Sequence, residues 1–145
     1  MRRETLLLAA LLALPLLGSD PSERYDGAAE PDGIEGTWVR VAAERDGRKA
    51  DIIAGSLTFL GGGRLLEETT GAAPRAGRFK LDNGPRPARL DIEYASDPPG
   101  LGRKFICQVG GDTLKVGFAV DLTAARPGSF ADRGTLIVTY RRVKK

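Results

Sequence analysis

The chain has 145 residues, enough for one ordinary domain, and 41% of them are hydrophobic, so a packed core is expected. Its formal net charge of +3 is too small to indicate a nucleic-acid partner. The lack of histidine excludes Ser-His and Cys-His catalysis and the commonest transition-metal ligand, and a single cysteine excludes an internal disulfide.

Residues 1–19 have the layout of a secretory signal peptide. Arg2 and Arg3 precede an apolar run that extends from Thr5 to Leu17, and Gly18-Ser19 supplies small residues for cleavage. The run is shorter than the roughly 20 apolar residues of a membrane-spanning helix. We therefore expect an extracytoplasmic protein, periplasmic or secreted, with no integral membrane segment after cleavage. The first 19 residues carry +1 of the formal charge of +3, which leaves +2 for the rest.

Residues 20–33 are predicted to be a flexible acidic leader. The stretch has five acidic residues, two prolines and almost no large apolar side chains, so it cannot bury enough surface to offset its chain entropy. The folded domain is expected to cover residues 34–145.

The first predicted strand runs from Gly36 to about Arg45 and carries Trp38, the only tryptophan. We expect Trp38 to fill one end of a small barrel and the Asp46-Gly47 pair to form a turn after the strand. Arg40 falls on the same face as Trp38, and a β-bulge would explain this imperfect alternation.

The next stretch, Lys49 to Ala54, is predicted to form a short helical segment over the barrel mouth. Its two apolar residues, Ile52 and Ile53, would act either as a lid over a ligand or as a hydrophobic plug. The plug is the commoner role, because apolar pairs usually fill a core.

Further strands are predicted wherever apolar residues alternate between Gly-, Pro- and Asn-rich turns. They lie around Leu57 and Phe59 and at 64–70, 76–81, 89–94, 103–109, 113–119 and 135–143. The residues expected to point inward are Leu57, Phe59, Phe79, Leu81, Leu90, Ile92, Phe105, Val109, Leu114, Val116 and Phe118. The count of about eight, mostly at hairpin spacing, favours a small all-β, antiparallel, up-and-down β-barrel or a sandwich. An eight-stranded barrel is either filled by side chains or holds one small ligand.

Few residues offer chemistry. Cys107 lies between Phe105 and Val109 on an apolar face and is expected to be a buried, inert thiol. Paired carboxylates can hydrolyse glycosides, but Asp91 and Glu93 alternate against an apolar face and should point into solvent. The interior should be apolar and offer no acid or base. We therefore predict no catalytic residue, no metal or cofactor site and no enzymatic activity.

The order of several short motifs resembles one family. The motifs are GTW at 36–38, DG at 46–47, FKLD at 79–82, PRPARLDI at 85–92, GGDTLKVGFA at 110–119, RPGSF at 126–130 and LIVTYRR at 136–142. Together they resemble the lipocalin-like, planctomycete-type uncharacterised domain family over essentially all of 34–145. The resemblance implies a lipocalin-like β-barrel in an extracytoplasmic protein, without an established activity. Gly117 departs from the family pattern, which often has Cys there. By analogy with classical lipocalins, Arg141 or Arg142 would stack on Trp38.

Two functions are consistent with these predictions. The first is a non-enzymatic binding module for a small apolar ligand, and the alternative is a structural or protein-interaction domain with a filled core that acts through its loops on an extracytoplasmic partner. The mouth residues in either case are predicted to be Ile52, Ile53, Leu101 and Phe130, with Trp38, Arg141 and Arg142 in structural roles. A monomer is expected.

Overall fold

The computed structural model describes residues 33–121 and 124–144. The predicted signal peptide at 1–19 and all of the predicted leader except Gly33 lie outside the described residues. Residues 33–145 form a unit by themselves.

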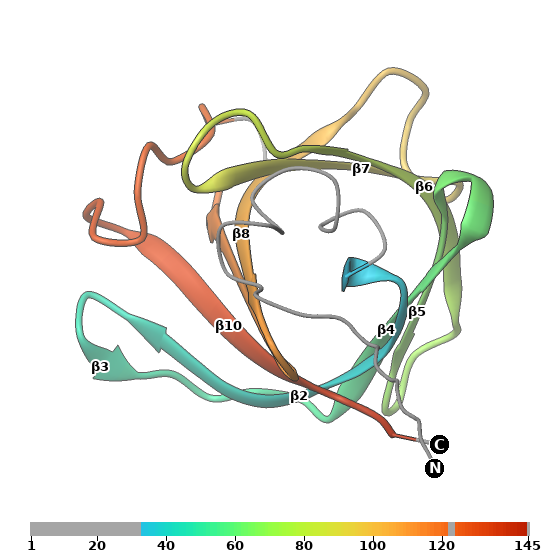
Figure 1. The fold of residues 1–145 in the computed structure, drawn as a ribbon, viewed down its shortest axis with the longest axis horizontal. Helices are drawn as coiled ribbons and strands as arrows, with labels where there is room; N and C mark the ends of the chain where they lie inside the picture. The colour runs from blue at the N-terminus through green and yellow to red at the C-terminus, as the bar shows by residue number, and fades with distance from the viewer. Residues whose placement is uncertain (1–32, 122–123, 145) are drawn as a thin grey trace, which may run out of the picture. The chain divides into compact units, whose positions relative to one another are not determined.

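One antiparallel sheet closes on itself to form the domain (Figure 1). In chain order its strands are β2 (Gly36–Arg45), β3 (Arg48–Lys49), β4 (Gly55–Leu60), β5 (Arg64–Thr69), β6 (Arg75–Asp82), β7 (Ala88–Tyr94), β8 (Arg103–Gly110), β9 (Thr113–Ala119) and β10 (Thr135–Arg142), with the 3-10 turn η3 (Gly61–Gly63) between β4 and β5. Each long strand pairs with the next one along the chain, and β10 pairs with β2. The short β3 only extends a hairpin of β2, so eight strands form the barrel. The predicted all-β, up-and-down barrel is confirmed.

The predicted helical segment at Lys49–Ala54 is wrong. Arg48 and Lys49 belong to β3 and pair with Arg45 and Glu44 across the Asp46-Gly47 turn. Both turn residues have positive φ, as a tight two-residue hairpin requires. The amide of Ala50 then donates to the carbonyl of Ala43 at 2.9 Å. The hairpin therefore holds the chain in an extended conformation up to Ala50, and residues 50–54 have no regular structure.

A β-bulge explains the imperfect alternation of β2. The register with β10 shifts between Thr139, which pairs with Ala42, and Tyr140, which pairs with Arg40, so Val41 is left without a partner. The extra residue keeps Arg40 on the face of Trp38 and still turns Ala43 inward, where it is buried.

Trp38 fills one end of the barrel, which we call the closed end. Its side chain is fully buried, and its Nε1–H donates to the carbonyl of Ile34 at 2.8 Å. The guanidinium of Arg142 lies over the indole ring, with Cζ 4.2 Å from the ring centroid. Arg142 also donates to the backbone carbonyls of Gly33 and Glu35. Of the two arginines predicted for this role it is therefore Arg142, while Arg141 is exposed.

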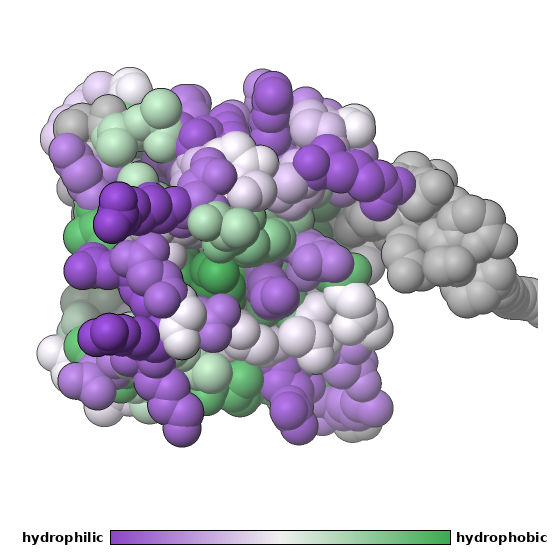
Figure 2. Space-filling model, turned by 90° about the vertical axis from the view of Figure 1, so that its left-hand side faces the viewer, coloured by the Kyte–Doolittle hydropathy of each residue, from purple (hydrophilic) through white to green (hydrophobic). Residues whose placement is uncertain are grey.

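The inward-facing residues form one core. All those expected to point inward are buried in the main hydrophobic cluster or packed against it, including Leu57, Phe59, Leu90 and Phe105. Cys107 is only 1% exposed, as predicted. The outer face seen in Figure 2 is mixed: hydrophilic residues predominate, and hydrophobic residues form separate groups between them. The strand patterns thus assigned most side chains to the correct side of the barrel wall.

Candidate functional site

The half of the barrel opposite Trp38 contains a cavity of about 310 Å³. Its lining comes from the inward-facing residues of the eight barrel strands and from residues 51–53, which follow β3. We call this the open end. The apolar part of the lining is Ala43, Ile52, Ile53, Leu57, Ile92, Phe105, Val116, Phe118, Leu136 and Val138. Because Trp38 and its neighbours fill only the closed end, the barrel is neither wholly packed nor wholly hollow.

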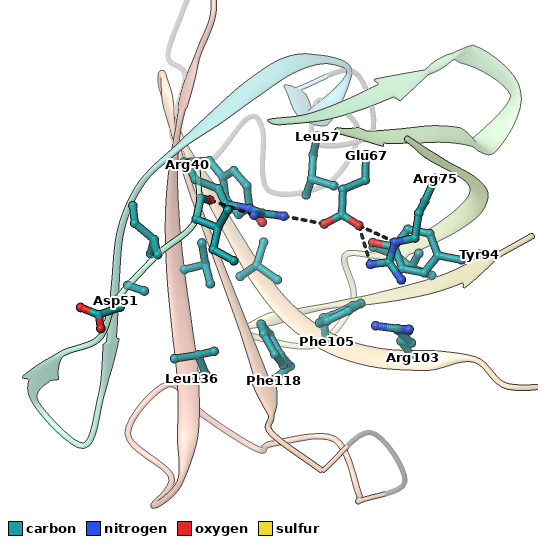
Figure 3. Close-up of a pocket in the computed structure, with 17 residues that line it drawn as sticks. Arg40, Asp51, Leu57, Glu67, Arg75, Tyr94, Arg103, Phe105, Phe118 and Leu136 are labelled. Atoms are coloured by element: carbon teal, nitrogen blue, oxygen red, sulfur yellow. Dashed lines mark hydrogen bonds and ion pairs between the residues drawn. The ribbon is translucent and has the colours of Figure 1, made fainter. Parts of the chain in front are cut away.

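A buried carboxylate lies at the centre of the cavity's polar part. Glu67, on β5, is 8% exposed and accepts from two guanidinium groups. Arg40 Nη2 is 2.6 Å from Oε2, and Arg75 Nη2 is 2.5 Å from Oε1 (Figure 3). Arg40 also donates to the carbonyl of Ile53 at 3.0 Å and to the hydroxyl of Thr69 at 3.2 Å. The strands β2, β5 and β6 are therefore joined inside the barrel by ion pairs.

Two tyrosines border this carboxylate. Burial raises the pKa of Tyr94 well above its ordinary value, and the charge of Glu67, which accepts a hydrogen bond from the Tyr94 hydroxyl, raises it further, while Arg75 opposes the shift. Burial also raises the pKa of Tyr140, with Arg40 acting in the opposite direction. Both phenols are therefore neutral hydrogen-bonding groups at ordinary pH.

Arg103 provides a third guanidinium at the open end. Its Nε and Nη2 donate to the two carboxylate oxygens of Asp97 at 2.8 and 3.0 Å. These hydrogen bonds lower the pKa of Asp97. The pair connects the start of β8 to the loop that precedes it and holds the Arg103 side chain along the cavity wall.

The expectation of a uniformly apolar interior is wrong at these positions. Arg40, Glu67, Arg75 and Arg103 line the cavity together with Tyr94. The sequence contains a signal that points to them: Arg40 shares a face with Trp38, and Glu67 shares one with Leu65, which is 2% exposed. A charge in the register of an apolar face, accompanied by an opposite charge on another strand, indicates a buried ion pair.

These groups can bind but are poorly placed to transfer protons. Both oxygens of Glu67 already accept hydrogen bonds from guanidinium groups, and the tyrosines stay protonated. Burial raises the pKa of Cys107 to about 12, so its thiol is a poor nucleophile. Asp91 and Glu93 lie on the outer side of β7, as predicted, and Asp91 pairs with Arg126 at 2.6 Å.

The four predicted mouth residues do not lie together. Ile52 and Ile53 line the cavity and are 38% and 61% exposed. Leu101 is not part of the lining. Phe130 lies on the outer wall, where a Cβ placed on Gly117 would be 3.1 Å from its ring. Gly117 faces outward because Val116 and Phe118 face inward, and its missing side chain leaves room for the ring of Phe130.

A wider hollow of about 550 Å³ lies at the β2–β3 hairpin. Its lining is mostly charged: Arg45, Asp46, Arg48 and Lys49 with Ala50 and Leu136. Solvated side chains of this kind offer little apolar surface to a ligand, so the interior cavity is the better candidate site.

Within the part of the chain that the structure describes, no cluster of three or more Cys, Asp or Glu side chains is arranged to hold a metal ion. Over the same residues, no helix has the length and apolar character needed to cross a membrane.

Fold and cavity together define a small, closed, antiparallel β-barrel with a ligand-sized cavity at one end. No protein-family model matches this chain, and neither does any curated protein or any solved structure. The family resemblance noted in the sequence stays a prediction.

Proposed function

We propose that this domain is a non-enzymatic binding module that holds one small, largely apolar ligand in the open half of the barrel. The observation that supports the proposal is the cavity of about 310 Å³, lined mainly by apolar side chains. Small-molecule sites typically measure about 300–1,000 Å³ and combine apolar walls with a few polar groups. Burial of the ligand's apolar surface against these walls would supply most of the affinity.

The polar groups support binding rather than catalysis. A general acid or base needs a pKa near the working pH and a proton that it can exchange. The Tyr94 and Tyr140 hydroxyls have pKa values raised above the ordinary range, and both Glu67 oxygens already accept from arginines. These groups orient a ligand through hydrogen bonds and charge.

We also propose that the protein acts outside the cytoplasm. The support is the arrangement of Arg2-Arg3, the apolar run and Gly18-Ser19 in the sequence. Protein recovered from the extracytoplasmic fraction should begin near Ser19 or Asp20, as read by N-terminal sequencing. Retention of Met1 on that material would contradict this assignment.

Native mass spectrometry of the protein purified from its own host tests the binding function. We expect a retained small molecule that is lost in Leu136→Trp, because the larger side chain would fill the cavity from β10. Thr139→Trp, on the outer face of the same strand, serves as the control and should retain the molecule. If the natural protein carries nothing and Leu136→Trp is more stable than wild type, the interior is better described as a scaffold core.

A further inference from the structure

The cavity has a cationic side built from two arginines around one ring. Cζ of Arg75 is 3.9 Å from the centroid of the Tyr94 ring, and Cζ of Arg103 is 5.0 Å from it. Both side chains line the cavity, and they are 34% and 17% exposed. Two guanidinium groups therefore remain within reach of a molecule that enters from the open end.

Both arginines retain hydrogen-bond donors after their internal contacts are made. Arg75 uses Nε and Nη2 on Glu67, and Arg103 uses Nε and Nη2 on Asp97. Among the contacts of the described residues, the Nη1 group of neither arginine has an acceptor. A guanidinium carries five N–H donors, and a donor that loses water without gaining an acceptor costs free energy. A ligand that enters this side is favoured if it brings an acceptor.

The charges around this side are unequal. Arg40, Arg75 and Arg103 lie near the two carboxylates Glu67 and Asp97, so among these five buried or half-buried groups the positive charges outnumber the negative ones by one. Asp51 also lines the cavity, but it is exposed, and Figure 3 draws it on the opposite side from Arg75 and Arg103. In a partly dehydrated cavity this imbalance favours an anion over a neutral group and disfavours a cation.

We infer that the ligand is a small amphipathic carboxylate whose anionic head lies against Arg75 and Arg103 and whose apolar body lies against Phe105, Phe118 and Leu136. This inference rests on the proposed binding function. A carboxylate matches the planar donor fork of arginine. At ~30 Å³ for each water-sized group, the cavity of about 310 Å³ has room for roughly ten non-hydrogen atoms. Octanoate, with a short flexible chain, is a probe of this size.

A matched series of probes separates the head group from the apolar body. Octanoate, 1-octanol and octylamine share one chain and differ in the charge of the head at pH 7. Titration calorimetry of the folded protein should show octanoate binding at least about tenfold tighter than octanol, with octylamine the weakest, because a hydrogen bond to a charged group is stronger than one between neutral groups.

Substitutions of the two arginines test whether they cause the preference for octanoate over octanol. Arg103→Gln should weaken octanoate binding by about tenfold and leave octanol binding within about twofold of wild type. Lys104→Gln, an exposed neighbour on β8, is the matched control and should change neither. Arg75→Gln should act like Arg103→Gln, with the exposed Arg78 on β6 as its control. Because Arg75 also stabilises Glu67, its variant is used only if its thermal melt shows that it folds.

The outcomes distinguish the two proposals. If octanol binds as tightly as octanoate and Arg103→Gln changes neither, the carboxylate inference is overturned while the binding function stands. If octylamine binds best, the charge assignment is overturned. If none of the three binds, both the inference and the proposed function are overturned.

Discussion

Arg142 shows how much a single side chain contributes to the closed end. It lies over the Trp38 ring and donates to two backbone carbonyls that precede β2. We expect Arg142→Gln to lower the free energy of unfolding by about 1–3 kcal/mol, because a cation–π contact and charged hydrogen bonds are lost together. Arg141→Gln should change it by less than about 0.5 kcal/mol, since that side chain is exposed. Urea unfolding measures both, and equal effects would contradict the assignment of the stacking role to Arg142.

The buried thiol of Cys107 should make the free energy of unfolding depend on pH. Burial raises the pKa of its thiol from 9.0 to about 12, so the unfolded chain loses this proton at lower pH than the folded one. The free energy of unfolding should therefore fall as pH rises between these two values, by at most about 1.4 kcal/mol per pH unit from this group. Tyr94 and Tyr140 shift in the same direction and add to the slope.

Comparison with Cys107→Ala isolates the contribution of the thiol to this pH dependence from that of the two tyrosines. The variant should have a shallower slope than wild type above pH 9.0, as measured by urea unfolding across that range. Identical slopes would show that the thiol is not buried. As a second measurement, a thiol reagent at pH 7 should label the native protein slowly and the unfolded chain quickly.

At the scale of elements, the segment 126–130 is fastened to the outer wall. Arg126 donates to the carbonyl of Phe105 at 2.7 Å and pairs with Asp91 at 2.6 Å. Pro127 is buried, and Phe130 packs over Gly117. These contacts lie on the side of β7, β8 and β9 that faces away from the cavity, so the segment supports the wall rather than the site.

Loss of Arg126 should release this segment before the barrel unfolds. We expect Arg126→Gln to lower the free energy of unfolding by about 1–3 kcal/mol and to speed proteolysis between β9 and β10, because local opening governs cleavage there. Arg133→Gln, an exposed arginine in the same connection, is the control. Limited proteolysis with mass mapping reads out the difference. Cleavage at equal rates in both variants would show that Arg126 does not hold the segment.

At the scale of the whole molecule, Glu67 connects strands that share no backbone hydrogen bonds. It joins β5 to Arg40 on β2, and β2 contacts β5 through no ladder of its own. Glu67→Gln should lower the free energy of unfolding by about 3–5 kcal/mol, because two guanidinium groups are left without their carboxylate in a dehydrated interior. Thermal and urea unfolding measure the loss.

A triple replacement tests whether charge or packing explains that loss. Arg40→Met, Glu67→Leu and Arg75→Met together remove the charges and keep much of the volume. We expect the triple variant to recover most of the stability lost in Glu67→Gln, since apolar substitution of a whole buried ion network is often neutral or stabilising. A triple variant less stable than Glu67→Gln would show that the network stabilises the barrel beyond mutual compensation of its charges.

The sequence by itself determined the order of most strands and the all-β, up-and-down class, while the pairing of β10 with β2 decided for a closed barrel over a sandwich. Alternation such as Leu90, Ile92 and Tyr94 against Arg89, Asp91 and Glu93 depends only on the two-residue period of a strand. The Gly-, Pro- and Asn-rich turns between the later strands specify hairpins locally, so those neighbouring strands could be paired without knowledge of the rest. At Asp46-Gly47 the turn was predicted, but the hairpin strand that follows it was not. The imperfect alternation at Arg40 even indicated the bulge that β2 contains.

The tertiary structure decided what local pattern could not. Lys49–Ala54 resembles a helical turn, but its first two residues are held extended by a hairpin with β2. Phe130 is apolar and lies in a long loop, yet only the outward position of Gly117 shows that it packs outside the barrel.

The polar side of the cavity is the clearest case in which the tertiary structure was needed. Arg40, Glu67 and Arg75 lie on three strands, and burying any one alone would be too costly. Closure of the barrel brings them within hydrogen-bonding distance, and that proximity makes their burial tolerable.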